Sequence, residues 1–301
     1  MWWIINHRDL YMYTGDIEYL KKQKEYFCAV TRNIMNLLDE SNEYSPSITS
    51  YVDWSAADKP QRWIGLRAVN ILCLQAASEI ADILGEYELK AECLKKKEKI
   101  ADHSADGAEE IKQITALCGL SGLMDIQKAA DIIENGGAKG FATFMGYYAI
   151  QVLAKAGRMD VATNIIRDYW GGMLKMGATT FWEDFDIEWM DESAPIDEIV
   201  PPGKKDIHGD FGKHCYTKFR HSLCHGWAGG PTAFMSQYIL GVFPSEPGYK
   251  KIKVMPSLGS LRYAKGKIPT PYGIISMEHK SENGKIITSI TKPDEIEIEG
   301  F

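Results

Sequence analysis

The period of the apolar residues changes once along this chain, and that change most limits the folds available to it. Apolar side chains recur at the spacing of amphipathic helices in residues 17–38, 62–84, 140–156 and 159–174. After "PSEPGY" the period becomes two, which is typical of short strands. The sequence therefore predicts an all-helical body over residues 1–244 and a β-sandwich-like domain over residues 245–301.

Glycines mark the expected turns. Gly15, Gly85 and Gly157 each stand where a helix end needs a left-handed residue, with an acidic residue close behind in the next helix. Such short turns predict antiparallel helical hairpins. A short helix is expected at residues 232–242, and Asn-Gly in "SENGK" predicts a β-hairpin turn.

Composition excludes several classes of protein. The net charge of −7 argues against a nucleic-acid partner, which usually needs a clustered basic surface. Six scattered cysteines without a CxxC pair favour reduced core thiols. No signal peptide is visible, and no apolar run reaches the roughly 18 residues of a membrane span. We expect no membrane partner and a cytoplasmic location.

The stretch "GATTFWEDFDIEWMDES", residues 177–193, interleaves two tryptophans with six carboxylates and contains no Lys or Arg. Unpaired carboxylates are costly to bury, so these either face water as a plain acidic loop or form a site that tolerates negative charge. Carbohydrate fits such a site, because carboxylates accept hydroxyl hydrogen bonds and indole packs against the C–H face of a sugar. Glycosidic cleavage also uses paired carboxylates.

A second group combines histidine and cysteine. Its members are His208, His214, Cys215, His221, Cys224 and His225. Their spacings match no standard zinc pattern, so we expect neither a metal nor another cofactor, and favour a histidine that hydrogen-bonds a hydroxyl in a pocket. A zinc-dependent transferase that uses this group stays an alternative. In "SYVDWSAADKPQ", a Trp beside an Asp in a loop is a further candidate sugar wall.

Together these segments resemble the bacterial α-L-rhamnosidases of glycoside hydrolase family 78. The run from Ser222 to Met277, which begins "SLCHGWAGGPTAF", is the most specific part. "TTFWE" resembles the segment that carries the family's catalytic base, and "YVDW" its substrate-lining loop. "MWWIINHRDLYMYTGD" resembles a helix in the middle of the catalytic domain.

The resemblance implies a mainly α fold, a partial (α/α)6 toroid followed by a C-terminal antiparallel β-sandwich. It implies an enzyme that hydrolyses terminal α-L-rhamnose with inversion, acting on a rhamnose-containing glycoside or polysaccharide. Glu183 would be the general base. Trp54 would pack against the sugar, Asp53 would support that loop or bond a hydroxyl, His225 would contact the sugar, and Trp182 would shape the wall beside Glu183.

One motif of the family is absent from this sequence. The family's general acid lies in an Arg-Asp-Glu motif, whereas "HRDL" at His7 and "IRDYW" at Ile166 lack the Glu. We therefore expect a partial gene product whose general acid lies upstream and which is inactive alone. Half-barrel faces left exposed would favour self-association. The alternative function is a non-catalytic carbohydrate-binding remnant of the same fold.

Overall fold

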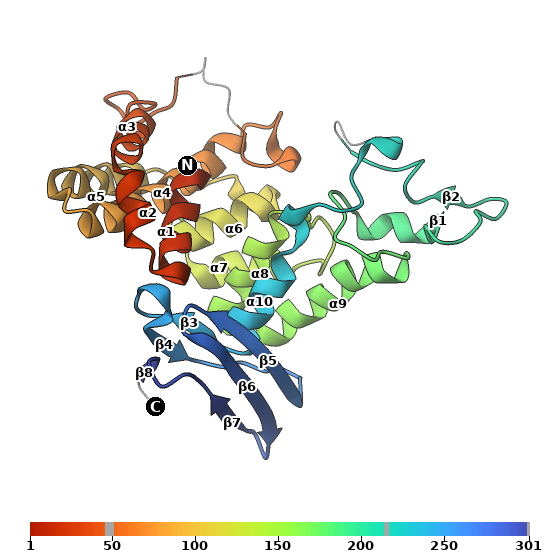
Figure 1. Cartoon of the computed structure of the whole chain (residues 1–301). Helices are drawn as coiled ribbons and strands as arrows, with labels where there is room; N and C mark the ends of the chain where they lie inside the picture. The colour runs from red at the N-terminus through yellow and green to blue at the C-terminus, as the bar shows by residue number, and fades with distance from the viewer. Residues whose placement is uncertain (46–50, 214–216, 300–301) are drawn as a thin grey trace.

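The computed structural model describes residues 1–45, 51–213 and 217–299, which form a helical body with a β-domain beneath it (Figure 1). The α-helices are α1 (Trp2–Thr14), α2 (Ile17–Lys22), α3 (Lys24–Met35), α4 (Arg62–Ile83), α5 (Tyr87–Ala101), α6 (Lys112–Ser121), α7 (Ile126–Glu134), α8 (Gly146–Lys155), α9 (Met159–Lys175) and α10 (Gly230–Phe234). The chain after α9 extends into an arm, where β1 (Ser193–Ala194) pairs in parallel with β2 (Lys205–Asp206).

Successive helices pack as an arc of hairpins. Helices α1, α4, α6, α8 and α10 follow one another in contact along one row, and α5, α7 and α9 each return against the preceding helix of that row (Figure 1). This alternation of two rows confirms the predicted mainly α fold, a partial (α/α)6 toroid followed by a β-domain.

The predicted glycine turns are confirmed. Gly15, Gly85 and Gly157 have φ of 68°, 74° and 80°, a region that disfavours any residue with a β-carbon. Each turn reverses the chain into the next helix. The apolar period over residues 17–38 predicts one helix, but the structure breaks it at Gln23 into α2 and α3.

Helix α4 forms the centre of the helical core. Its most apolar stretch is long enough to cross a membrane, but 72% of that stretch is buried inside the fold, which is typical of a core helix. Cys73 lies on α4 and is fully buried, and burial raises the pKa of its thiol to about 12. Cys93 and Cys118 are buried free thiols as well, whereas Cys28 is partly buried and Cys224 is exposed, so not every described cysteine is a core thiol; Cys215 lies outside the described residues.

The β-domain consists of two three-stranded sheets. Its strands are β3 (Val242–Pro244), β4 (Lys251–Val254), β5 (Tyr263–Thr270), β6 (Gly273–Glu282), β7 (Lys285–Thr291) and β8 (Glu297–Glu299). One sheet has the order β5-β6-β7 and is wholly antiparallel. The other has the order β3-β4-β8, and its β4–β8 pair is parallel.

Apolar side chains from both sheets share one core, which makes the β-domain a sandwich. Val242 and Ile252 of one sheet pack in the same cluster as Ile275 and Met277 of the other. The predicted Asn-Gly turn joins β6 to β7, with φ of 50° at Asn283 and 75° at Gly284.

The helix predicted at residues 232–242 ends three residues early, at Ile239. α10 ends at Phe234, continues as a π-helical turn over Met235–Ile239, and the chain then enters β3. Gly241 makes this change possible, because its φ is 67° and a β-carbon there would lie 2.2 Å from the backbone of Met255. β3 thus lies before the domain boundary that the sequence predicts between residues 244 and 245. The position of that boundary stays a prediction.

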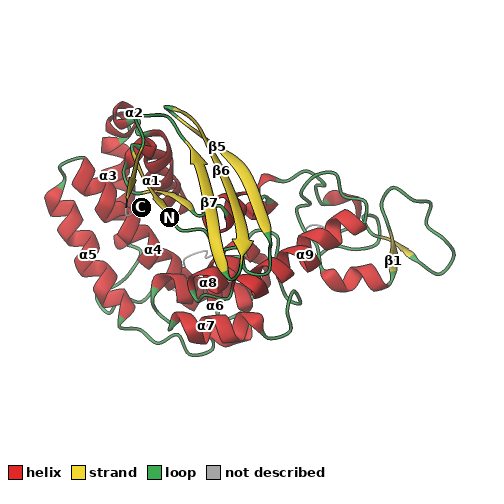
Figure 2. Ribbon diagram, turned by 90° about the horizontal axis from the view of Figure 1, so that it is seen from below, coloured by secondary structure: helices red, strands yellow, loops and turns green. Residues whose placement is uncertain are grey.

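The β-domain meets the helical body at the first turn of the chain. Gly15, after α1, packs against Gly248 in the turn before β4, and a β-carbon on Gly15 would lie 3.1 Å from the α-carbon of Gly248. Seen from below, the sheet β5-β6-β7 extends across the helical body (Figure 2). The two domains therefore touch through backbone at this point.

Candidate functional site

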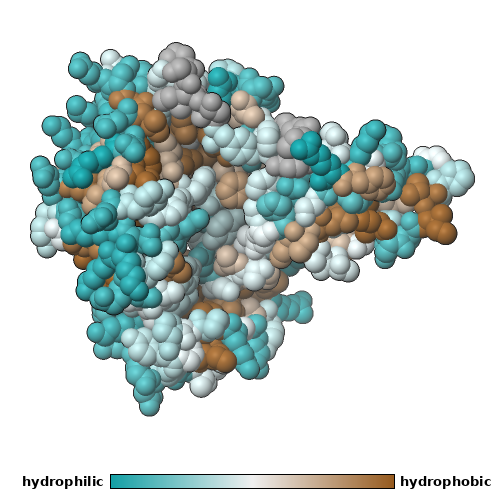
Figure 3. Space-filling view, turned by 45° about the horizontal axis from the view of Figure 1, so that its top comes forward, coloured by the Kyte–Doolittle hydropathy of each residue, from teal (hydrophilic) through white to brown (hydrophobic). Residues whose placement is uncertain are grey.

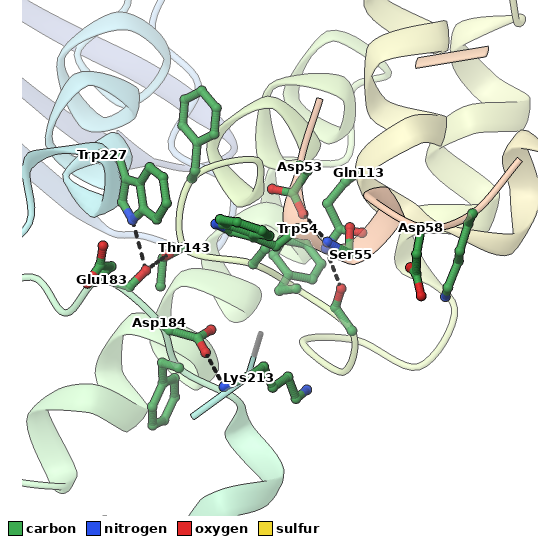
Figure 4. Close-up of a pocket in the computed structure, with 16 residues that line it drawn as sticks. Asp53, Trp54, Ser55, Asp58, Gln113, Thr143, Glu183, Asp184, Lys213 and Trp227 are labelled. Atoms are coloured by element: carbon green, nitrogen blue, oxygen red, sulfur yellow. Dashed lines mark hydrogen bonds between the residues drawn. The ribbon is translucent and has the colours of Figure 1, made fainter. Parts of the chain in front are cut away.

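A pocket of about 390 Å³ opens between three segments that are distant in the sequence. They are the loop before α4, the loop before α8, and the segment after α9 together with residues near η5 (Gly226–Ala228). The lining includes Asp53, Trp54, Thr143, Glu183, Asp184 and Trp227. Figure 4 shows Glu183 and Trp227 on one side of this pocket and Asp53 on the other.

The first wall of the pocket is the Asp53–Trp54 loop. Asp53 is 5% exposed, and its Oδ1 accepts a hydrogen bond from the Ser55 N–H at 2.9 Å. This side chain caps the 3₁₀ turn η1 (Trp54–Ala56), as Asp commonly does at a helix start. Trp54 is half-buried, with its ring centroid 5.0 Å from that of Tyr51 in an edge-on arrangement. The loop thus presents an indole to the pocket.

The second wall is built around Glu183, whose backbone is held from two other segments. Its N–H donates to the Ser222 carbonyl at 2.9 Å. Its own carbonyl accepts from Thr143 Oγ1 at 2.5 Å and from Trp227 Nε1 at 2.8 Å. The Glu183 position is therefore fixed by partners from the loop before α8 and from the segment around η5.

The Glu183 carboxylate also has defined partners. Oε2 accepts the Ser222 N–H at 2.7 Å, and Oε1 lies 3.4 Å from His225 Nε2. The side chain is 11% exposed, so it reaches the pocket while most of its surface is covered. A mostly covered carboxylate with a fixed orientation can accept a proton from a water held in the pocket.

Two of the predicted site residues do not line the pocket. Trp182 is only 2% exposed and packs edge-on against Phe185 in the core, with 5.9 Å between the ring centroids. Its side chain therefore lies behind the wall, against Phe185, which lines the pocket, and its predicted role in shaping that wall stays a prediction. His225 contacts Glu183 but lines a different hollow.

That second hollow is an apolar groove of about 710 Å³ between α9 and α10. His225 and Cys224 line it together with Trp170, Leu174 and Met235. Leu174 is 69% exposed. Figure 3 shows apolar side chains gathered along the arm that α9 and the following segment form. His225 thus stands between Glu183 and the groove.

Sequence reasoning missed Trp227 and Thr143. Trp227 lines the pocket and stacks on Phe144, with 5.7 Å between ring centroids and 13° between planes. Its position two residues after His225, in "HGW", is the signal that could have found it. Nothing in the sequence around Thr143 indicates its hydrogen bond to Glu183, because the two are 40 residues apart.

The acidic stretch obtains its counter-charges from other segments. Asp186 pairs with Lys213, Glu192 with Lys205, and Glu188 with Lys139 at 3.1 Å. Lys205 lowers the pKa of the Glu192 carboxyl through a hydrogen bond and its charge. Asp184 accepts a hydrogen bond from the Lys213 backbone N–H at 3.2 Å. The segment is thus partly an ion-paired surface, and Glu183 and Asp184 are the acids of this stretch that line the pocket.

The histidine and cysteine group does not form one cluster in the described residues. His208 and His221 lie with their ring centroids 4.7 Å apart, whereas His225 turns to Glu183; His214 and Cys215 lie outside the described residues. His221 is 2% exposed, and burial, with a smaller effect of His208, lowers its pKa to about 4. Within residues 1–45, 51–213 and 217–299, no three His, Cys, Asp or Glu side chains converge to hold a metal ion.

Two sequence comparisons find similarity to bacterial alpha-L-rhamnosidases. Residues 241–299 match the family described as the bacterial alpha-L-rhamnosidase C-terminal domain. Over 153 residues the chain is 31% identical to an alpha-L-rhamnosidase of Alteromonas sp. (strain LOR). The aligned region covers 49% of this chain and 14% of that protein.

Solved structures share the fold of nearly the whole chain. The GH78 family rhamnosidase of Bacillus sp. GL1 superposes with a TM-score of 0.76 at 20% identity, over 98% of this chain and 32% of that one. The Aspergillus terreus α-L-rhamnosidase has a TM-score of 0.76 at 19% identity, and the match covers 98% of this chain and 36% of that one. A Streptomyces avermitilis α-L-rhamnosidase complexed with L-rhamnose has a TM-score of 0.74 at 19% identity, and the match covers 95% of this chain and 28% of that one. The chain spans about a third of the length of these proteins.

Proposed function

We propose that this chain is a relative of the bacterial α-L-rhamnosidases of glycoside hydrolase family 78, and that its pocket binds a terminal α-L-rhamnosyl unit and contributes to its hydrolysis. The observation that carries the proposal is the meeting of Glu183 with the Asp53–Trp54 loop in one pocket. The substrate of the whole protein is then a rhamnose-containing glycoside or polysaccharide.

In this proposal Glu183 is the general base of an inverting reaction. Its carboxylate removes a proton from water as the water attacks the anomeric carbon, and an acid on the opposite face protonates the departing oxygen. Trp54 packs its indole against the apolar C–H face of the sugar. The hydrogen bonds that fix the Glu183 backbone hold the base where the water must be deprotonated.

We propose that the proton donor comes from polypeptide other than this chain. The sequence contains no Arg-Asp-Glu motif, and the structural relatives are about three times as long as this chain. The chain alone then cleaves only substrates whose leaving group departs without protonation.

The test is hydrolysis of a nitrophenyl α-L-rhamnoside, because nitrophenolate leaves without a proton donor. We expect slow turnover by the chain, lowered on the order of 10²–10⁴-fold in Glu183→Gln. Calorimetry with L-rhamnose is expected to show that this variant still binds the sugar. Unchanged turnover in Glu183→Gln removes this residue from the mechanism. Proton NMR of the first product reports the stereochemistry, and an α-anomer contradicts inversion.

A non-catalytic carbohydrate-binding function is the second candidate. It is favoured by the same missing motif, since the Trp54 wall can bind a sugar without any proton donor. L-Rhamnose binding without turnover of the nitrophenyl substrate supports this candidate.

The exposed apolar groove at Leu174 also supports the predicted self-association, which sedimentation velocity tests.

A further inference from the structure

We propose that Gln113 contacts the sugar in the pocket, and that its side-chain oxygen accepts a hydrogen bond from a sugar hydroxyl group. The inference deepens the proposed function and rests on it. Gln113 lies in the first turn of α6 and lines the same pocket as Glu183 and Trp54. The partners of its side-chain amide carry the inference.

The amide of Gln113 is buried in an otherwise covered part of α6. Gln113 is 4% exposed, and residues 113–119 of the helix are all buried. A primary amide in such a place costs free energy unless its polar atoms have hydrogen-bond partners. What each end of the amide meets therefore decides what the side chain does.

The nitrogen end of the amide is bonded to the loop before α8. Nε2 of Gln113 donates to the Gly140 carbonyl at 2.7 Å. This bond fixes the orientation of the amide, because a carbonyl oxygen only accepts, and an amide turned over would place two acceptors against each other. The oxygen Oε1 is therefore the end that does not face Gly140.

The oxygen end has no hydrogen-bond partner among the residues that the structure describes. It is also not sealed from solvent, unlike Oδ1 of Asn70 on α4, which is both buried and unpaired. Because Gln113 lines the pocket, this accessible oxygen belongs to the pocket surface. A ligand that fills the pocket must bring a donor to Oε1 or leave it unpaired.

The position of Gln113 suits contact with a sugar held between the two walls. Figure 4 shows Gln113 beside Asp53 and Ser55, across the pocket from Glu183 and Trp227. An amide oxygen accepts hydrogen bonds and carries no net charge, so it favours a neutral donor such as a hydroxyl group. The base and the hydroxyl acceptor would then meet the sugar from opposite sides.

An indirect role through the loop is the alternative. Gly140 stands three residues before Thr143, whose hydroxyl donates to the Glu183 carbonyl, so loss of the Gly140 bond would displace the proposed base. The same loop is also held by Lys112, whose Nζ donates to the Gly137 carbonyl at 2.7 Å. A displaced base lowers kcat, whereas a lost sugar contact weakens binding.

Two variants separate the sugar contact from the loop bond. Gln113→Met is similar in size and loses both ends of the amide. Gln113→Glu keeps an acceptor oxygen but loses the donor to Gly140. Gln61→Met is the matched control, because Gln61 is 8% exposed and bonded to Glu110 at 2.5 Å, but does not line this pocket. L-Rhamnose calorimetry and nitrophenyl α-L-rhamnoside hydrolysis compare these variants with the unmodified chain.

We expect Gln113→Met to weaken L-rhamnose binding and raise KM roughly five- to tenfold, while kcat changes less than about twofold, because one hydrogen bond to the bound sugar is lost. Gln113→Glu is expected to recover most of the affinity, and Gln61→Met to bind as the unmodified chain does. Equal weakening in both Gln113 variants, or a lowered kcat at unchanged KM, assigns the loop role and overturns the contact.

A measurement on the sugar side does not depend on Gln113→Glu. Fluorine in place of a hydroxyl group cannot donate a hydrogen bond. We expect one monodeoxyfluoro-L-rhamnose to bind the unmodified chain roughly five- to tenfold more weakly than L-rhamnose, and to bind Gln113→Met about as well as L-rhamnose does. If every analogue loses as much affinity in Gln113→Met as in the unmodified chain, the contact is overturned.

The two proposals fail in different ways. A folded, unmodified chain that binds no L-rhamnose overturns the proposed function and this inference with it. L-Rhamnose binding that is equal in the unmodified chain and in Gln113→Met overturns the contact alone and leaves the proposed function in place.

Discussion

The two walls of the pocket are held in different ways. The Glu183 wall depends on partners from distant segments, because Thr143 and Trp227 donate to its carbonyl and Ser222 bonds both its backbone and its carboxylate. In the Trp54 wall, Asp53 caps the 3₁₀ turn through the Ser55 N–H, and the Trp54 ring meets that of Tyr51 edge-on.

The hydrogen bonding of each wall can be compared with its proposed role in catalysis or in sugar binding. A base must stand within a fraction of an ångström of its water, and displacement by about 1 Å can cost on the order of 10² in rate. An indole that packs against a sugar face tolerates small shifts, because dispersion and hydrophobic contact have no strict direction. The hydrogen bonds to Glu183 are therefore found where proton transfer is proposed. Three changes test this comparison.

The largest effect is expected from removing both side-chain donors to the Glu183 carbonyl, in Thr143→Val with Trp227→Phe. The carbonyl is then left without either bond in a covered position, which costs about 2 kcal/mol of unfolding free energy. We also expect kcat to fall at least about tenfold. Urea unfolding and nitrophenyl rhamnoside turnover measure the two effects. Thr143→Ser, which keeps the hydroxyl, is the control, and a double variant as stable as this control contradicts the assigned role of the bonds.

A smaller and different effect is expected at the other wall. Trp54→Ala should weaken L-rhamnose binding roughly tenfold, because the indole face against the sugar is lost. Because Trp54 is half-buried and packs on Tyr51, we expect the unfolding free energy to fall by about 1 kcal/mol. Calorimetry and urea unfolding are the measurements, with Trp54→Phe as the control that keeps an aromatic face. If Trp54→Ala binds L-rhamnose as well as the unmodified chain does, this loop is not the sugar wall.

The smallest effect concerns the pH dependence of the Glu183 wall, behind which His221 is buried. Burial and His208 lower the pKa of His221 to about 4, against a small opposing effect of Glu183. Its pKa is about 6.5 when unfolded, so the unfolded chain takes up this proton first. Stability from His221 is complete above about pH 6.5 and is lost as the pH falls toward 4.

We expect this histidine to account for roughly 1 kcal/mol of the stability lost between pH 7 and pH 5.5. Urea unfolding at both pH values, compared with His221→Phe, isolates the contribution from that of the carboxylates. The variant should lose less stability on acidification than the unmodified chain. An equal loss in both proteins means that His221 titrates normally in the folded state.

Much of the fold could be predicted because it depends on local patterns. The change of apolar period separates helices from strands, and Gly15, Gly85 and Gly157 mark three of the hairpin turns. The passage from α10 into β3 could not be predicted, because the need for Gly241 arises from a backbone approach to Met255 that no local pattern records.

The site could be predicted only as far as motifs extend. "TTFWE" and "YVDW" led to Glu183 and the Asp53–Trp54 loop, which the structure brings to one pocket, while their roles stay predictions. Trp182 lies in the core, because residues adjacent in sequence can point to opposite sides, and its role in the wall stays a prediction. Thr143 acts through a hydroxyl bonded to a backbone carbonyl 40 residues away, which leaves no trace in either segment.

The contact between Gly15 and Gly248 has a consequence for how the two domains move. Main chains that approach this closely leave no layer of side chains that could change rotamer and let one surface slide over the other. The β-domain is therefore fixed against the first helical hairpin at this point. A methyl group added at either glycine would push the two main chains apart.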